Sequence, residues 1–245
     1  MSGGSPTIGE ANGSSGEERR NMTAFARTKR NKVVRHPERG RYEREAIDAI
    51  VDEALICHVG FVQDGQPFVI PTLHARDGDT LLLHGSSASR LMKHAGAGHP
   101  VCVTITLVDA LVLARSVFNH SINYRSAALY GQGRLITDRD EKLAALARFT
   151  ERIVPGRWDD ARLPTAQELK ATAVVAIPID SASAKVRVGP PKDDAEDLGL
   201  PVWAGLIPLT SGLGAPIPAP DADPALPLPD YLRAYLAGQS GSEPQ

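Results

Sequence analysis

Residues 55–85 read LICHVGFVQDGQPFVIPTLHARDGDTLLLHG, and this stretch decides the fold. Asp64-Gly65 and Asp77-Gly78-Asp79 divide it into three short runs of apolar and β-branched residues. An Asp-Gly pair between two such runs is typical of a tight hairpin turn. The stretch therefore predicts three strands joined by two tight turns, which is an antiparallel meander.

A helix is predicted on each side of the meander. Apolar residues at helical spacing predict one over 43–54. The second is a short helix over 86–96, where Ser86 or Ser87 is suited to the N-cap and a glycine follows the last turn.

The rest of the chain continues the mainly β pattern. Apolar runs predict further strands over 100–108, 110–118, 124–137, 172–180 and 182–189. Helices are predicted over 138–154 and 165–170, and the second opens with the capping-box pattern Thr165-x-x-Glu168.

Closely spaced strands interrupted by short helices exclude a doubly wound parallel sheet. No GxGxxG or phosphate-binding P-loop follows a strand. A mainly β protein with short helices, folded as a closed or nearly closed antiparallel barrel, is therefore expected, because closure removes exposed strand edges. Gly131 and Gly133 predict a bend or bulge in the strand that contains them.

Composition divides the chain into three parts. Residues 1–29 are rich in Gly, Ser, Glu and Arg without an apolar run, which predicts a disordered N-terminal arm. Residues 30–208 have the length of one domain. Residues 209–245 form a proline-rich C-terminal tail.

The charge balance argues against nucleic acid or an anionic membrane as partner. The formal net charge is −2, from 27 basic and 29 acidic residues. The basic run from Arg27 to Arg35 is either an electrostatic arm or a solvated lead-in. Cys57 and Cys102 lie in apolar runs without a CxxC motif, which predicts buried free thiols. No stretch of 18 apolar residues occurs, and a cytoplasmic location is expected.

The segment His84-Gly85-Ser86-Ser87-Ala88-Ser89-Arg90 is the strongest candidate site. It runs from a predicted strand into the first turn of a predicted helix, where free backbone amides gather. Arg90 lies four residues after Ser86, so the two side chains share a face and can close on one phosphate. A serine-capped surface helix with an incidental arginine is the alternative.

Three other groups of polar residues could carry chemistry. Ser183, Lys185 and Arg187 alternate on one strand face, where they would meet a ligand phosphate, a subunit interface or solvent. Residues 115–126 are densely polar between apolar strands, which indicates a site or an interface. Within them His120 is either an acid or base or is satisfied by backbone. No carboxylate cluster accompanies the strand histidines, so no metal site is predicted.

The chain resembles the pyridoxamine 5′-phosphate oxidase-like family of FMN-binding split barrels, in its flavin-nucleotide-binding branch. The resemblance lies in HVGFVQDGQPFVIPTLHARDGDTLLLHGSSASRLMK (58–93), LVLARSVFNHSINYRSAALYGQGRLI (111–136), PGRWDDARLPTAQELKAT (155–172) and SASAKVRVGPPKDDAEDLGLPVWAG (181–205). In order and spacing these stretches span roughly residues 35–208.

The resemblance implies an antiparallel split β-barrel and a homodimer with two FMN molecules at the subunit interface. Pro71 and Thr72 would line the flavin ring through their backbone, and Ser86, Ser89 and Arg90 would hold the phosphate. The full set of implied cofactor-binding residues is Pro71, Thr72, His84, Ser86, Ser89, Arg90, Asn123, Lys185, Arg187 and Trp203.

The resemblance does not extend to the substrate of the pyridoxamine phosphate oxidases. True pyridoxamine phosphate oxidases have an Arg-Leu-His-Asp/Glu-Arg-type signature near the C-terminus, whereas here Trp203 is followed by AGLIPLTSG. We expect an FMN-dependent oxidoreductase that acts on an unidentified small molecule, with the redox chemistry supplied by the flavin. The alternatives are a non-catalytic flavin carrier or sensor, and a haem-binding split barrel with His58, His84 or His120 as axial ligand. A deazaflavin (F420) could also replace FMN.

Overall fold

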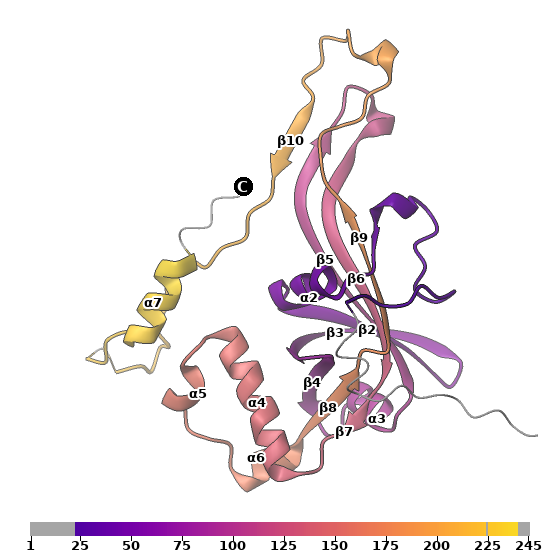
Figure 1. Ribbon diagram of the computed structural model, residues 1–245. Coiled ribbons are helices and arrows are strands. Elements are labelled where there is room, and N and C mark those ends of the chain that lie inside the picture. Colours follow the sequence, from indigo (N-terminus) through magenta and orange to yellow (C-terminus); the bar gives the residue numbers. More distant parts are fainter. Residues whose placement is uncertain (1–22, 224, 240–245) are drawn as a thin grey trace, which may run out of the picture.

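The computed structural model describes residues 23–223 and 225–239, and its centre is a ten-stranded antiparallel sheet (Figure 1). The strands are β1 (Gly40–Arg41), β2 (Ile56–Gln63), β3 (Gln66–Asp77), β4 (Thr80–Ser86), β5 (Pro100–Leu113), β6 (Ser121–Gln132), β7 (Arg134–Leu135), β8 (Thr172–Pro178), β9 (Ser181–Arg187) and β10 (Gly205–Pro208).

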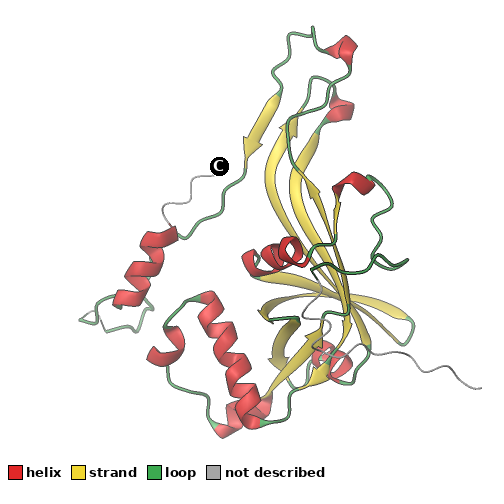
Figure 2. Cartoon of the chain, viewed as in Figure 1, coloured by secondary structure: helices red, strands yellow, loops and turns green. Residues whose placement is uncertain are grey.

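Helices surround the sheet, and α4, α5 and α6 gather on one side of it (Figure 2). The α-helices are α2 (Arg44–Glu53), α3 (Arg90–Gly96), α4 (Arg139–Ile153), α5 (Arg157–Asp160), α6 (Ala166–Ala171) and α7 (Asp230–Gln239). Three short 3₁₀ helices are η1 (Pro37–Arg39), η2 (Val117–Asn119) and η3 (Ala195–Asp197). Within the described ranges, no helix is long and apolar enough to cross a membrane.

The sheet is not closed. Its strands follow the linear order β1-β9-β6-β5-β2-β3-β4-β8-β7, with β10 paired to β5. The mainly antiparallel split-barrel expectation is confirmed, and the expectation of closure is corrected. The two end strands, β1 and β7, have only two residues each, so they leave few unpaired backbone groups and closure is not needed to protect them.

The predicted meander is confirmed in detail. Strands β2 and β3 pair from Ile56↔Leu73 to Gln63↔Gln66 around the Asp64-Gly65 turn, and β3 pairs with β4 around Gly78. Asp64 and Gly65 both have positive φ, 52° and 73°, as the two central residues of a type I′ turn require. The local chemistry of the turns thus sets the register of the three strands.

The two strands predicted over 100–108 and 110–118 are one strand. Strand β5 runs without a break from Pro100 to Leu113, and its pairing with β6 shifts by one residue between Val108 and Ala110. Asp109 is the extra residue, which a β-bulge accommodates without ending the strand. Strands β5 and β6 extend beyond the rest of the sheet as a long hairpin, with β10 along the outer part of β5 (Figure 1).

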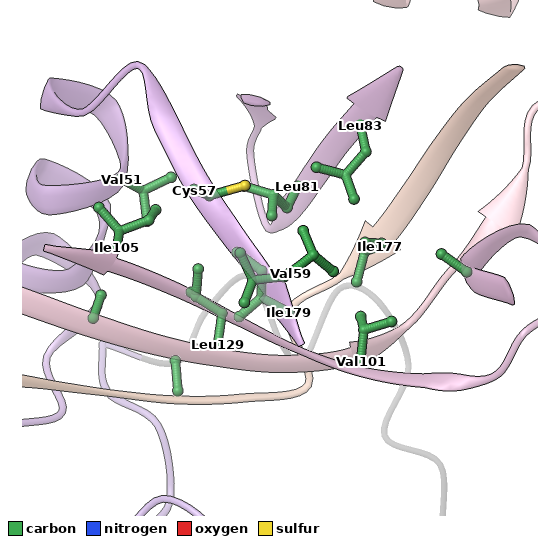
Figure 3. Packing of buried hydrophobic residues seen from close by; sticks show 14 of the residues in the cluster. Val51, Cys57, Val59, Leu81, Leu83, Val101, Ile105, Leu129, Ile177 and Ile179 are labelled. Atoms are coloured by element: carbon green, nitrogen blue, oxygen red, sulfur yellow. The ribbon is translucent and has the colours of Figure 1, made fainter. Parts of the chain in front are cut away.

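The main hydrophobic core lies between the sheet and helices α2 and α3. Figure 3 shows alternate residues of β2, β4 and β5 converging there, among them Cys57, Val59, Leu81 and Leu83, each at most 1% exposed. Burial raises the pKa of the Cys57 thiol to about 12, so this cysteine is the buried thiol that the sequence predicts. Cys102 is only half-buried.

A second core lies on the other face of β4 and β8, beneath α4. It contains Leu82, Val174, Ala176 and Phe149. Strands β4 and β8 are therefore buried on both faces, which explains their unbroken apolar runs.

Gly131 and Gly133 stand where β6 gives way to β7 against β8. A Cβ atom at Gly131 would lie 2.2 Å from the carbonyl oxygen of Pro178, and one at Gly133 would lie 2.7 Å from that of Ala95. Only glycine allows this close approach of backbones. The predicted irregularity at the two glycines is confirmed, and its cause is tertiary packing.

The predicted N-terminal arm and the predicted C-terminal tail both contain more structure than the sequence indicates. Residues 1–22 of the predicted arm lie outside the described residues, but Phe25 is buried and its amide donates to the carbonyl of Tyr42 at 2.8 Å. In the predicted tail, α7 packs on α5, where the Tyr231 hydroxyl donates to the Asp160 carboxylate at 2.8 Å. The folded unit thus begins before residue 30 and includes part of the tail.

Arg152 of α4 ties three elements together. Its guanidinium donates to the carbonyl oxygens of Val51 (2.9 Å), Asp52 (2.7 Å) and Ala54 at the end of α2, and to that of His74 on β3 (3.2 Å). The last carbonyls of a helix have no partner within the helix, and a cation there is also favoured by the helix dipole.

We predict that Arg152→Ala lowers the free energy of unfolding by about 2–3 kcal/mol, because charged hydrogen bonds to several backbone carbonyls are lost together. Arg139→Ala, at the exposed start of the same helix, is the matched control and should change it by less than about 0.5 kcal/mol. Urea unfolding followed by circular dichroism measures both variants. Equal effects of the two variants would contradict the role of Arg152.

The buried histidine His74 should make the stability of the fold depend on pH. It is fully buried, its Nε2 lies 2.8 Å from the carbonyl oxygen of Val51, and its Nδ1 has no hydrogen-bond partner among the described residues. Burial lowers the pKa of His74 below its ordinary value of 6.5, so the unfolded chain binds the proton more readily than the folded one. The free energy of unfolding should therefore fall as the pH drops below about 6.5, by up to about 2 kcal/mol near pH 5.

His74→Gln, whose side chain does not titrate and keeps an N–H donor, should show a shallower loss over the same pH range. Urea unfolding at about pH 7 and about pH 5 compares the two proteins. Parallel pH profiles would show that another group causes the loss.

Candidate functional site

Six of the ten residues implied as cofactor ligands lie on adjacent elements. Pro71 and Thr72 are on β3, His84 and Ser86 are on β4, and Ser89 and Arg90 stand where α3 begins. The structure thus gathers these six residues around the end of the meander.

Local structure around Ser86 differs from the prediction. The N-cap of α3 is Ser89 rather than Ser86 or Ser87, and the helix has seven residues, Arg90–Gly96. The amide of Ser89 donates to the carbonyl of Ser86 at 2.9 Å, and the amide of Ala88 donates to Oγ of Ser86 at 3.2 Å. These amides are therefore already paired, and positive charge at the site comes mainly from side chains.

The charged side chains line a cavity of about 610 Å³. It is lined by Gln63, Asp64, Ala88, Arg90, Lys93, His94 and His99. Arg90 rests over the ring of Phe68, 4.2 Å from its centroid, and neither Arg90 nor Lys93 has a carboxylate partner in the described part of the chain. Two unpaired cations beside a cavity favour the anion-site interpretation over the serine-capped helix.

Sequence reasoning missed Lys93 as a site residue. Arg90 and Lys93 are three residues apart, a spacing that places both side chains on one helix face. With no acidic residue in α3, this cationic pair was the available signal.

His84 faces a second cavity, of about 400 Å³, between the meander and helices α4 to α6. Its walls are largely apolar, but the Arg162–Glu168 ion pair also lines it; the apolar residues are Leu73, Leu146, Phe149, Ile153 and Trp158. The imidazole ring lies 4.3 Å from the ring of Phe149, and its Nδ1 is buried without a hydrogen-bond partner.

Burial lowers the pKa of His84 below 6.5, so its imidazole is neutral near pH 7. A neutral imidazole in an apolar cavity can ligate a metal or take up a proton. Phe149 and Trp158 come from segments distant in the sequence, and sequence reasoning assigned neither of them to the site.

Asn123 and Arg187 pair with each other instead of facing the meander. Both are buried, the Arg187 guanidinium donates to Oδ1 of Asn123, and Nδ2 of Asn123 donates to the carbonyl of Gly189 at 3.2 Å. Lys185 lines a smaller cavity of about 270 Å³. Strands β6, β5 and β2 separate β9 from β3 in the sheet, so this group does not lie on strands adjacent to those of the first six residues.

The polar residues at the far end of the hairpin mainly hold it against the segment that follows β9. Arg115 donates to the Asp193 carboxylate through its backbone amide (2.7 Å) and its guanidinium (2.8 Å). His120 is exposed with its Nδ1 2.9 Å from the carbonyl of Ser116, which favours the backbone-satisfied interpretation. Trp203 is 64% exposed and precedes β10, remote from the meander.

An open, wrapped antiparallel sheet with short helices packed on both of its faces defines a split-barrel protein. The sequence model of the family described as pyridoxamine 5′-phosphate oxidase matches residues 43–186. The chain belongs to this family, whose members bind flavin.

Two solved structures are similar over nearly their whole length. The flavocytochrome Anf3 from Azotobacter vinelandii is 41% identical, with a TM-score of 0.80 over 84% of this chain and 96% of that chain. The FAD and haem binding protein from Mycobacterium smegmatis is 39% identical, with a TM-score of 0.77 over 80% of this chain and 96% of that chain. No curated protein matches the sequence.

Proposed function

We propose that this protein is an oxidoreductase that binds a flavin nucleotide at the end of the meander and a haem at His84, and that these two groups would supply its redox chemistry. The observation that carries the proposal is His84, whose buried Nδ1 has no hydrogen-bond partner among the described residues and which faces a largely apolar cavity two residues before the flavin-phosphate segment. The similarity to a flavocytochrome and to an FAD and haem binding protein supports the same pair of cofactors.

The flavin would lie along the end of the meander. Arg90 and Lys93 would hold its phosphate, with the hydroxyls of Ser86 and Ser89 nearby, and the backbone of Pro71 and Thr72 would flank its ring. Flavin supplies the redox chemistry, so the protein's part is to bind the ring, orient it and shield it from water. FMN and FAD share the parts that this half of the site contacts.

The haem would be ligated by His84. The residues fit this role because, apart from the Arg162–Glu168 ion pair, the cavity lining is largely apolar, and because a neutral imidazole is a common haem ligand. The other two candidates fit less well: His58 is exposed on β2, and the ring of His120 already faces a backbone carbonyl. A cavity of about 400 Å³ encloses only part of a large macrocycle, so a second protein surface must cover the rest.

A homodimer would supply that surface. Apolar residues are exposed along the hairpin and β10, among them Val108 (41%), Phe118 (91%) and Ile207 (44%). Exposed apolar patches of this kind mark protein interfaces. The same association would allow Lys185 of the partner subunit to approach the flavin site, as the family resemblance implies.

We predict that Arg90→Ala weakens FMN binding by roughly 1.5–3 kcal/mol, or about 10- to 100-fold, because a charged hydrogen bond to the phosphate is lost. Titration of the apoprotein with FMN, followed by flavin fluorescence, measures the dissociation constant. Arg233→Ala, on the exposed surface of α7, is the matched control and should bind as the wild type does. Unchanged affinity in Arg90→Ala would remove this residue from the site.

We predict that His84→Ala abolishes the Soret band of the haem-loaded protein while the absorption of bound flavin remains. The reason is that the axial ligand is lost while the anion site is untouched. His58→Ala and His120→Ala are the controls and should keep the band. A Soret band that persists in His84→Ala, or a wild-type protein that takes up no added haemin, would contradict the haem assignment.

A further inference from the structure

One wall of the His84 cavity belongs to neither hydrophobic core. Trp158 lines the cavity and is half-buried on α5, a helix of a single turn. Within the described ranges, neither α5 nor α7 contributes a residue to the two cores. Other walls are held more firmly, because Leu73, Leu146 and Phe149 belong to the second core or pack against it. The α5 wall can therefore move without disturbing either core.

Glu151 holds α5 from the side of α4. Its carboxylate accepts hydrogen bonds from the backbone amides of Gly156 (2.7 Å) and Trp158 (2.8 Å). These bonds lower the pKa of Glu151, so the carboxylate is ionised near pH 7. Gly156 stands between α4 and α5 with a φ of 84°, a conformation that glycine adopts without strain. The corner between the two helices is thus a glycine hinge held by one ionised side chain.

Tyr231 of α7 holds α5 at both of its ends. Its ring rests on Gly156, where an added Cβ atom would lie 3.2 Å from Cγ of the tyrosine. Its hydroxyl donates to the carboxylate of Asp160 at 2.8 Å and accepts from the guanidinium of Arg157 at 3.1 Å. Arg157 and Asp160 also pair with each other at 3.0 Å. One side chain of α7 therefore contacts the first and the last residue of α5.

Helix α7 is itself lightly held. Figure 1 shows it beside α5 and apart from the sheet. Along residues 230–238 every residue is half-buried or exposed, and none is fully buried. A helix of ten residues is marginal by itself in water, so α7 depends on this docking. Residues 209–223 and 225–227, which join it to β10, are all exposed, so α7 can leave α5 without moving the sheet.

We propose that α5 and α7 form a lid over the His84 cavity, that Tyr231 is its latch, and that release of the latch lets a broad planar ligand reach His84. The closed cavity, of about 400 Å³, encloses only part of such a ligand. Movement of α5 about Gly156 takes Trp158 out of the lining, and its return closes the cavity again. The inference rests on the proposed haem for the identity of the ligand, whereas the latch consists of the described side-chain contacts.

Quenching of Trp158 fluorescence by acrylamide measures how often the lid is open, without any ligand. Trp158 and Trp203 are the two tryptophans of the chain, so a Trp203→Phe background leaves Trp158 as the sole reporter. Tyr231→Ala in this background should raise the quenching constant at least about twofold, because local opening exposes the indole to the quencher. Tyr231→Phe keeps the ring on Gly156 and loses the hydroxyl, so it should give an intermediate value.

Two further measurements separate a lid from a structural support. Urea unfolding followed by circular dichroism should give Tyr231→Ala the midpoint of the wild type, because α7 lies outside both cores. Haemin should enter Tyr231→Ala about three- to tenfold faster than the wild type, because entry scales with the open fraction. Arg233→Ala is the matched control, since Arg233 is exposed on the same helix and bonds to Leu228 and Asp230. This variant should keep the quenching constant and the rate of haemin entry.

Each alternative outcome has its own signature. Unchanged quenching in Tyr231→Ala, or an equal increase in Arg233→Ala, would overturn the latch and leave the haem proposal standing. A lower unfolding midpoint in Tyr231→Ala would make α7 part of the stable fold and not a lid. Raised quenching with an unchanged rate of haemin entry would overturn control of access to His84. A wild type that takes up no haemin would overturn the haem site, while the quenching result still decides the lid.

Discussion

Burial of β4 on both of its faces is the constraint on which the site depends. Leu81 and Leu83 enter the main core, while Leu82 between them packs beneath α4 with Phe149. A strand enclosed in this way cannot slip by one residue without exchanging its two faces, so its register is strongly specified. The end of β4 therefore has a defined position, and the polar residues that follow it are held by a rigid element.

Polar chemistry appears where that enclosure ends. His84 is the first half-buried residue after the three leucines, and Ser86 is already exposed. Neighbouring residues thus experience different surroundings: a neutral histidine in an apolar cavity and, a few residues later, cations beside an aqueous one. The proposed haem at His84 and the proposed phosphate site at Arg90 both rest on this sharp change of environment.

Elsewhere polar residues are explained by the need to pair within the fold. Asn123 and Arg187 are buried on neighbouring strands and satisfy each other, as buried polar groups must. At the base of the hairpin, Arg125 joins the bulged Asp109 to Glu53 of α2. These contacts fix how the hairpin leaves the sheet, and they show why a dense run of polar residues need not itself form a binding site.

Local chemistry along the sequence determined the meander, since Asp-Gly turns set the register of neighbouring strands. It also determined the capping box of Thr165 and Glu168, which forms within one helical turn. It also singled out Arg90 as a candidate phosphate ligand. Tertiary structure alone decided that β5 continues through a bulge, that the sheet stays open, that Phe25 joins the core, and that Phe149 and Trp158 enclose His84. The physical reason is range: turns and caps involve atoms a few residues apart, whereas cavities and core contacts depend on packing between segments that only the complete fold brings together.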